Sequence, residues 1–595
     1  MQVRKSFLIG IIIVACFLAY FNTLSAGFVW DDNILIVNNP FIKSFKFLPE
    51  YFTHDIWKIS GQAVNRGYYR PLLAASFMLD YSFWKDSAFG YHLTNLILHI
   101  LAGLSVFVFL EMLIKDTLAA FISAMLFILH PIHSESVSFI CGRVDILALL
   151  CFMLGLVFFI RSARSPKKGF FVIPGLFFFL GLLFKETTIV LPLIVLVTDY
   201  LYLSQGNIKE IARYLFKRYA GFLVAFLLYM VFRLLFTKFS FLALNKQYYM
   251  NYSFGSGNLW WLFTPFLIIA KYVRLLFFPI NLKADYFFQP ASGFFDPAAL
   301  CGAVLAGLSL YIFIRHRKKN KIIALSVAWF FIAILPVLNL IPSGNIFAER
   351  YLYLPSLGFC MAIGVLFSRI LQVTLIRKAS NARILTGIIL FLLFFTYGSL
   401  TFERSKFWQN DHTLWLNTAE ASPLSSRAHL NLANVYLSEN SLDKAWDEAK
   451  FTLKLSPGNK NALVTLGLVL FKKGKPEDAI NKFEEAIRAD SEDCGIIYGN
   501  IAMVFNSVGK YQEAVVAGEK AIKENPYLDK ARLNLAFSYV SIGNISQAIR
   551  ELEDYILINP RDAAAVSILG KLYYKSGDLK KASAYKTAVR KIIRN

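Results

Sequence analysis

Hydrophobic residues follow two different patterns along the chain. Between about residue 7 and residue 400, continuous apolar runs alternate with short polar or basic stretches. A run of about 20 apolar residues is long enough to cross the hydrocarbon core as a helix. From residue 426 to residue 595, apolar residues instead recur every three or four positions, as in amphipathic helices. The pattern predicts an all-α protein with a polytopic membrane bundle followed by a soluble helical domain.

The apolar runs predict about eleven transmembrane helices. They cover approximately residues 7–26, 95–113, 117–133, the run between Asp145 and Arg161, 170–184, 187–203, 219–237, 298–314, 322–341, 352–373 and 384–400. The run 260–279 carries Lys271 and Arg274, and a crossing there would put later basic clusters outside. We expect it to lie at the interface or against the bundle, and the soluble domain to be extracytoplasmic.

Composition refines this interpretation without changing it. The chain is 56% hydrophobic, with a mean hydropathy of +0.51 and a net charge of +23. Most of the basic excess lies in short clusters between apolar runs, which is a topology signal and not a nucleic-acid footprint. The six cysteines are scattered, so neither a disulfide framework nor a thiolate metal site is predicted.

The soluble part repeats with a period of 34 to 35 residues. The small residue of the second helix recurs as Ala445, Ala479, Ala514, Ala548 and Ala582. This spacing is typical of tetratricopeptide repeats, whose helix pairs stack into a superhelix with a concave face. We predict a membrane domain at 1–401, a linker at 402–425, and a repeat domain at 426–595 with repeats 426–459, 460–494, 495–528, 529–562 and 563–595.

Ionisable residues gather on the predicted outer side of the membrane. Asp31 and Asp32 directly follow the first span, where charge is costly unless water, a partner or a substrate meets it. Arg70, Glu135, Arg143, Asp145, Lys185, Glu186, Glu349 and Arg350 lie in other outer segments. His92, Asn95 and His99 share one helical face, and we expect His130 and His133 to line a polar cavity instead of forming a metal pair.

Several motifs in this order carry a resemblance. They are Phe28-Val-Trp-Asp-Asp32, Tyr69-Arg-Pro-Leu72, Gly90-Tyr-His-Leu-Thr-Asn95, His130-Pro-Ile-His-Ser-Glu-Ser136, Gly142-Arg-Val-Asp145, Lys185-Glu186 and Ala348-Glu-Arg-Tyr-Leu-Tyr-Leu-Pro355. With them the chain resembles the transmembrane and tetratricopeptide-repeat protein O-mannosyltransferases of the GT-C superfamily, and we expect a bacterial relative at the inner membrane. The resemblance implies a glycosyltransferase that moves mannose or another hexose from a polyprenyl-phosphate carrier to protein Ser or Thr.

Inverting displacement of a lipid phosphate needs a carboxylate base and cations for the leaving group. The predicted catalytic residues are Asp31, Asp32 and Glu135, and the predicted phosphate-binding residues are Arg143, Lys185, Arg350 and Arg70. The predicted supporting polar residues are His92, His130, His133, Asp145, Glu186 and Glu349. A divalent cation is an open alternative if the acid pair and Glu135 converge.

The repeats are predicted to hold a protein or peptide acceptor. Asn431, Asn500 and Asn534 precede the Leu-Ala or Ile-Ala pair of three repeats. This resembles the asparagine ladder of the O-GlcNAc transferase, where amides satisfy a peptide backbone. The bland alternative is that they fill a solvated helix face.

Two other functions fit the same elements. One is a transferase or ligase that acts on envelope polysaccharide or a lipid-linked glycan. The other is a non-catalytic membrane scaffold or transporter that carries the repeats. A scaffold needs no acid pair at the membrane face, and a transporter would show discontinuous spans or a repeated half.

Overall fold

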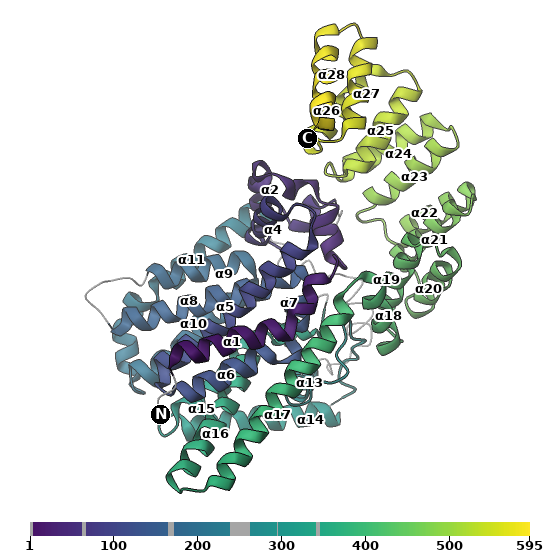
Figure 1. The fold of residues 1–595 in the computed structure, drawn as a ribbon. Helices are drawn as coiled ribbons and strands as arrows, with labels where there is room; N and C mark the ends of the chain where they lie inside the picture. The colour runs from purple at the N-terminus through teal and green to yellow at the C-terminus, as the bar shows by residue number, and fades with distance from the viewer. Residues whose placement is uncertain are drawn as a thin grey trace. The chain divides into compact units, whose positions relative to one another are not determined.

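Helices make up all the regular secondary structure of the described residues in the computed structural model. The structure describes residues 4–61, 67–164, 172–237, 262–293, 295–340 and 345–594. Their contacts divide the chain into two units. The first unit contains Met1–Asp32 and Tyr69–Asn417, and the second contains Asn33–Tyr68 and Thr418–Asn595. The prediction of an all-α protein is confirmed (Figure 1).

Every predicted apolar run lies on a helix of the first unit. These helices are α1 (Lys5–Tyr20), α5 (Ala88–Ile114), α6 (Thr117–Leu129), α8 (Arg143–Arg164), α9 (Val172–Phe184), α10 (Leu191–Thr198), α11 (Ile208–Thr237), α14 (Pro297–His316), α15 (Lys321–Ile334), α16 (Ser356–Ile376) and α17 (Ser380–Ser405). Among the described residues, eight helices are long and apolar enough to cross a membrane. The pair Thr117–Leu129 and Pro131–Ser138, bent by 51°, is a ninth candidate, and Val172–Phe184 and Lys321–Val337 are apolar but shorter. The count of eleven crossings therefore stays a prediction.

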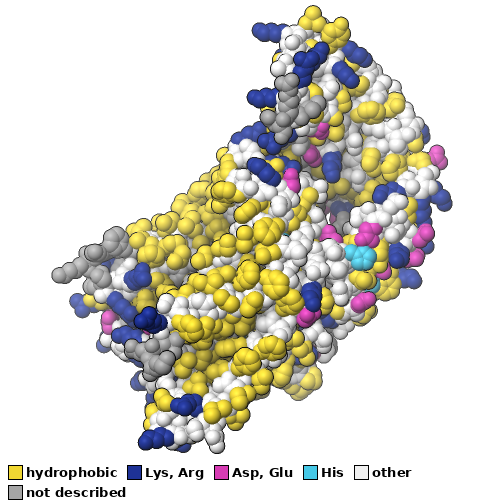
Figure 2. Space-filling model, in the orientation of Figure 1, with side chains coloured by type: hydrophobic (Ala, Val, Ile, Leu, Met, Phe, Trp, Pro, Cys, Tyr) yellow, Lys and Arg dark blue, Asp and Glu magenta, His cyan; other side chains and the backbone are white. Residues whose placement is uncertain are grey.

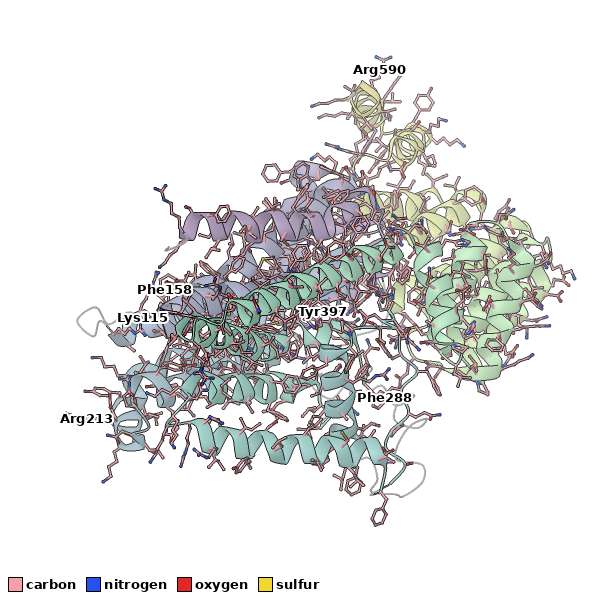
Figure 3. The ribbon with its side chains drawn as sticks, turned by 60° about the horizontal axis from the view of Figure 1, so that its bottom comes forward. Lys115, Phe158, Arg213, Phe288, Tyr397 and Arg590 are labelled. Carbon is pink, nitrogen blue, oxygen red and sulfur yellow. The ribbon has the colours of Figure 1, made fainter. Side chains whose placement is uncertain are left out.

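The surface of this unit fits a membrane setting. Exposed apolar side chains cover the helices, for example Val14 and Leu18 on α1 and Phe391 and Phe395 on α17. Figure 2 shows them as a broad hydrophobic band, with Lys and Arg gathered at the end of the bundle where the N-terminus lies. Lys115 and Arg213 lie at this same end (Figure 3). This arrangement agrees with basic clusters that share one side of the membrane.

The run at 260–279 is a short buried helix in its described part. Residues 260 and 261 lie outside the described residues, and α13 spans Thr264–Phe277. Its 14 residues include Lys271 and Arg274, and it is not among the helices of the described residues that are apolar enough to cross a membrane. Leu267, Ile268 and Tyr272 are buried in a cluster with α15 and α14 side chains. We therefore describe α13 as packed against the bundle, as expected.

Five helix pairs form the repeats of the second unit. They are α19 (Ser426–Ser438) with α20 (Leu442–Leu455), α21 (Lys460–Lys472) with α22 (Pro476–Ala489), α23 (Gly495–Ser507) with α24 (Tyr511–Glu524), α25 (Asp529–Ser541) with α26 (Ile545–Ile558), and α27 (Ala563–Lys575) with α28 (Leu579–Arg594). Ala445, Ala479, Ala514 and Ala548 have no exposed surface, because each lies where paired helices approach closely. Side-chain oxygens of Ser425, Asn459 and Asp562 cap three first helices.

Two segments of the chain differ from the predicted division into membrane domain, linker and repeats. The predicted linker 402–425 carries the end of α17 and the helix α18 (Asp411–Ala421). Residues 33–68 carry a short π-helix, two 3₁₀ turns and the helices α2 (Leu48–Thr53) and α3 (Ile56–Ile59). The contacts group this segment with the repeats, whereas the sequence analysis places it in the membrane domain.

Candidate active site

The acid pair lies at the end of a tightly held turn. His92 Nε2 contacts the carbonyl oxygen of Gly27 at 3.2 Å, and the Trp30 amide donates to Asp411 Oδ1 at 2.7 Å. Trp30 adopts a φ of +53°, a left-handed conformation that a bulky residue keeps only when its surroundings hold it. Its ring stacks on Phe139 with a centroid distance of 5.4 Å. The backbone before Asp31 is therefore fixed from three sides.

Asp31 and Asp32 have different surroundings. Asp32 is fully buried, and its two carboxylate oxygens accept from the amides of Val29, at 3.1 Å, and Cys141, at 2.9 Å. Burial raises the pKa of Asp32 to about 7, although both amide hydrogen bonds act in the opposite direction. Asp31 is half-buried. Asp32 thus joins the turn to the start of α8, and Asp31 is the more accessible acid.

Glu135 pairs with Arg350 across the bundle. Glu135 is fully buried on α7 (Ser134–Ser138), and Arg350 lies on a 3₁₀ turn at Glu349–Leu352. One oxygen of Glu135 accepts from the Arg350 amide at 2.9 Å, and the other forms an ion pair with the Arg350 guanidinium. That guanidinium also lies 5.8 Å from the Trp30 ring centre. The predicted second acid and a predicted phosphate ligand therefore meet beside the turn that carries the acid pair.

Two further predicted cations lie in the same neighbourhood. Lys185 forms an ion pair with Asp145, and its ammonium group lies 5.6 Å from the centre of the Tyr351 ring. Burial lowers the pKa of Lys185, and the charges of Arg70 and Arg350 add to that effect while Asp145 opposes it. The charges of these three cations therefore act on one another, and each cation is also paired with a carboxylate.

Arg70, whose charge also lowers the pKa of Lys185, pairs with Glu186, the residue that follows Lys185. Its guanidinium binds Glu186 with two hydrogen bonds of 3.2 and 2.7 Å, the fork geometry that arginine favours. Arg70 precedes Pro71, which starts α4 (Pro71–Trp84). The side chains of Arg70 and Arg350 each keep 17% of their surface exposed, so neither is fully closed off from its surroundings. Arg70, Lys185 and Arg350 are called the cationic cluster below.

Arg143 lies apart from this cluster. It is fully buried, 2.6 Å from Asp80 Oδ2, and its Nε donates to Asn95 Oδ1 at 2.8 Å. Another guanidinium nitrogen donates to the carbonyl oxygen of Tyr91 at 3.1 Å. Asn95 in turn donates to the carbonyls of Val137, Phe139 and Ile140. The surroundings of Arg143 are those of a residue that holds α4, α5 and the loop after Glu135 together.

Glu349 has partners other than the residues of the cationic cluster. It accepts from the Tyr286 hydroxyl at 2.7 Å and from the Lys283 amide, and it lies 3.6 Å from Arg404. Burial raises the pKa of Glu349 to about 7. Glu349 therefore ties the 3₁₀ turn that presents Arg350 to the segment after α13.

The buried histidines brace the bend between α6 and α7. His130 contacts the carbonyl of Leu276 at 3.0 Å, and His133 contacts Phe127 O at 2.7 Å and Ser356 Oγ at 2.9 Å. His99 contacts the Tyr353 hydroxyl at 2.8 Å. Pro131 lacks an amide hydrogen and ends α6, so these contacts replace helical ones. Among the described residues no group of three or more His, Cys, Asp or Glu side chains could hold a metal ion.

The repeats contain a cavity of about 380 Å³ on their first helices. Its lining residues are Asn434, Leu437, Ser438, Leu468, Phe471, Lys472 and Met503. The predicted ladder residues are not among them: Asn431 Nδ2 donates to Arg427 O of its own helix, and Asn500 and Asn534 are half-buried. Asn434, Leu468 and Met503, which line the cavity, each lie three residues after the ladder position of their repeat. The cavity lining is therefore more apolar than the predicted asparagine ladder.

Sequence reasoning missed Trp30, Tyr351 and Asp80. Trp30 and Tyr351 each neighbour a predicted site residue, and both lie under the Arg350 guanidinium. An aromatic residue beside an ionisable one is a weak signal for a cation–π contact. Asp80 lies on an apolar helix, where a carboxylate needs a cationic partner, and that partner is Arg143.

Comparison with known proteins tests these observations at the level of the family. The tetratricopeptide-repeat family models match residues 464–529 and 507–572. "Protein O-mannosyl-transferase F38B6.6" of Caenorhabditis elegans is 28% identical over 75% of this chain and 62% of its own length. Human TMTC3 and TMTC1, both called protein O-mannosyl-transferases, are 23% and 27% identical over 96% and 76% of this chain.

The chain is a homologue of the TMTC protein O-mannosyl-transferases. It spans 62% of the nematode relative and 69% and 55% of the two human ones. These relatives are animal proteins and do not support the expected bacterial origin. Among solved structures, MamA and the TPR protein YrrB match with TM-scores of 0.26 at 24% and 21% identity. They cover 28% and 30% of this chain and 91% of their own length.

Proposed function

We propose that the protein is an integral-membrane glycosyltransferase that moves mannose from a polyprenyl-phosphate carrier to Ser or Thr hydroxyls of proteins outside the cytoplasm. The observation that carries the proposal is the meeting of Glu135 and Arg350 between the acid turn and Lys185. The names of the homologues support the class of reaction. An acid beside a cluster of cations is what a displacement at a sugar phosphate requires.

The reaction forms one bond to the sugar and breaks one. The acceptor hydroxyl oxygen attacks C1 of mannose while Asp31 takes the hydroxyl proton. The bond between C1 and the phosphate oxygen breaks on the opposite face, and its electron pair leaves with the polyprenyl phosphate. Asp31 is assigned as the base because it is the more accessible acid, whereas both oxygens of Asp32 accept backbone amides.

The cationic cluster stabilises the leaving group. The donor phosphodiester carries one negative charge, and the departing phosphate gains a second as the C1–O bond breaks. Arg350 and Arg70 have partly exposed side chains with guanidinium groups suited to phosphate, and Lys185 adds a compact charge. Glu135, Asp145 and Glu186 hold these cations in place. Because the cations bind the phosphate more strongly as its negative charge develops, they lower the reaction barrier and not merely the KM.

The experiment uses the full chain in lipid nanodiscs with polyprenyl-phosphate mannose, radiolabelled in the sugar, and a Ser- and Thr-rich unfolded protein. Wild type is expected to label the protein, and Arg350→Gln to lower the single-turnover rate by about 10² to 10³. GDP-mannose without the lipid is the matched donor control. Labelling from the nucleotide sugar alone, or an unchanged rate in Arg350→Gln, contradicts the proposal. In a parallel reaction with envelope glycan added, labelling of the glycan but not of the protein would favour the polysaccharide alternative.

A further inference from the structure

The segment that follows the acid pair packs on a turn between two repeats. Tyr527 lies between α24 and α25, and its ring meets Phe41 edge-on with centroids 5.5 Å apart. The same ring meets His54 at 5.6 Å, and its hydroxyl donates to Glu50 Oε2 at 3.2 Å. Burial, followed by the nearby Glu50 carboxylate, raises the pKa of Tyr527 to about 12, so the hydroxyl keeps its proton at neutral pH.

A second contact extends the interface along the repeats. Lys46 Nζ donates to the carbonyl oxygen of Leu557 at 2.9 Å, near the end of α26. Gly61 lies beside Leu528, since a Cβ added there would be 3.9 Å from a methyl carbon of that leucine. The segment therefore touches the end of the third repeat and the second helix of the fourth.

The segment is a folded module. Asn39 has no exposed surface, and its amide donates to Leu35 O, Tyr51 Oη and Ser60 Oγ at 3.0, 2.8 and 3.1 Å. Asp55 accepts from the amides of Trp57, at 2.8 Å, and Tyr68, at 2.6 Å. These internal bonds close the segment on itself and fix Phe41, Glu50 and His54 where Tyr527 meets them.

The repeat fold does not require a tyrosine at position 527. The corresponding positions after the proline of other repeat turns are Gly458 and Arg561. Arg561 is exposed, and Gly458 has open space around its Cβ position. A large aromatic residue occurs at the turn that contacts the module, so its presence is explained by docking and not by repeat stacking.

We propose that residues 33–61 are a docking module for the repeat superhelix and that Tyr527 is its positioning residue. The proposal rests on the proposed function and adds how the acceptor-binding domain is coupled to chemistry. The module continues directly from Asp32 at one end, and its chain returns to Arg70 at the other. Tethering by docking as well as by the chain raises the effective concentration of a repeat-bound acceptor at the site.

The test compares Tyr527→Ala, Tyr527→Phe and the matched turn variant Arg561→Ala in the full chain in nanodiscs. Amide hydrogen exchange reports docking, because loss of the contact should speed exchange across residues 33–61 about tenfold. The KM for an unfolded Ser- and Thr-rich protein should rise about tenfold in Tyr527→Ala, while kcat on a short Ser/Thr peptide stays unchanged. The exchange rate and the KM of Tyr527→Phe should lie between those of wild type and those of Tyr527→Ala. Arg561→Ala should match wild type in both.

Glu50→Gln tests the same interface from the module side and leaves the repeats untouched, so it covers misfolding of Tyr527→Ala. Unchanged exchange in both Tyr527→Ala and Glu50→Gln overturns the docking module. Faster exchange with an unchanged KM for the protein acceptor overturns the positioning role. If wild type transfers mannose to no acceptor, the proposed function fails, and the exchange measurement still decides docking alone.

Discussion

Asp31 and Asp32 are neighbours in the chain, yet their surroundings assign them different roles. An asparagine at position 31 keeps the shape of the side chain and removes the proposed base, so Asp31→Asn should lower the transfer rate by about 10² to 10⁴ with an unchanged melting temperature. At position 32 an asparagine would replace one accepting oxygen with an NH₂ group. That group would face the backbone N–H of Val29 or Cys141, which is also a donor. Asp32→Asn should therefore cost about 1 to 3 kcal/mol of stability.

Single-turnover transfer and thermal melting in nanodiscs measure both effects. Asp31→Glu serves as the control, since it keeps the carboxylate but moves it by one methylene. Near-wild-type transfer by Asp31→Asn, combined with a large rate loss and normal melting in Asp32→Asn, would reverse the two roles.

The buried carboxyl of Asp32 predicts a pH dependence near neutrality. Burial raises its folded pKa to about 7, so it is neutral below that pH and ionised above it. The ionised form accepts both amides well and holds the turn, so the transfer rate should rise with pH through about 7. Stability should move the other way, because the contribution of a group with a raised folded pKa is lost as pH rises through that pKa.

Transfer rates and melting temperatures measured at assay pH values from about 5.5 to about 8.5 check this expectation. This range extends about 1.5 units either side of the folded pKa. In Asp32→Asn the rise of the transfer rate near pH 7 should be lost, after correction for its lower rate. The pH dependence of the melting temperature should shrink to the part contributed by Glu349, whose pKa burial also raises to about 7. If the pH dependence of the rate near pH 7 persists unchanged in Asp32→Asn, the titration belongs to another group.

At the scale of elements, the backbone of α7 is approached closely by Gly142, which follows it in the chain. A Cβ added at Gly142 would lie 2.6 Å from Glu135 O and 2.9 Å from Ser136 Cα. Since these are backbone atoms, Gly142→Ala must displace α7 and with it the Glu135–Arg350 pair. We expect a destabilisation of about 1 to 3 kcal/mol and a rate loss larger than stability alone explains.

Gly387→Ala on α17 is the matched control, because nothing lies within 4 Å of its added Cβ. Alanine favours a helix over glycine by about 1 kcal/mol, so this variant should melt at or above the wild-type temperature. Thermal melting and single-turnover transfer of both variants provide the measurement. Equal behaviour of the two variants would show that the approach at Gly142 is not tight.

The elements could be predicted because their signals are local. Apolar runs and the alanine spacing identify the bundle helices and the repeats without knowledge of contacts. The site was only partly predictable, because Glu135 meets Arg350 across 215 positions and no periodicity encodes that pairing. The burial of Arg143 and the strained φ of Trp30 also depend on packing. Docking of residues 33–61 on the repeats had no signal beyond the unusual Tyr527.

At the scale of the whole molecule, the side of the membrane that carries the repeats decides whether acceptors outside the cytoplasm can reach them. Between Lys319, in a basic cluster, and the repeats lie α15, α16 and α17. Three crossings would put Lys319 and the repeats on opposite sides, and the basic cluster favours the inside. The helix α15 is the uncertain member, because Lys321–Val337 is shorter than the other spans.

Introduced cysteines test this directly in sealed, right-side-out vesicles. The native Cys494 is buried and cannot serve as a probe, whereas Arg561 and Lys319 are exposed. In a background with Cys301→Ala, which removes an exposed thiol, a membrane-impermeant maleimide should label Arg561→Cys at once. Lys319→Cys should react only after the membrane is permeabilised. Labelling of both before permeabilisation would mean that α15 does not cross, and protection of Arg561→Cys alone would place the repeats inside, away from any extracytoplasmic acceptor.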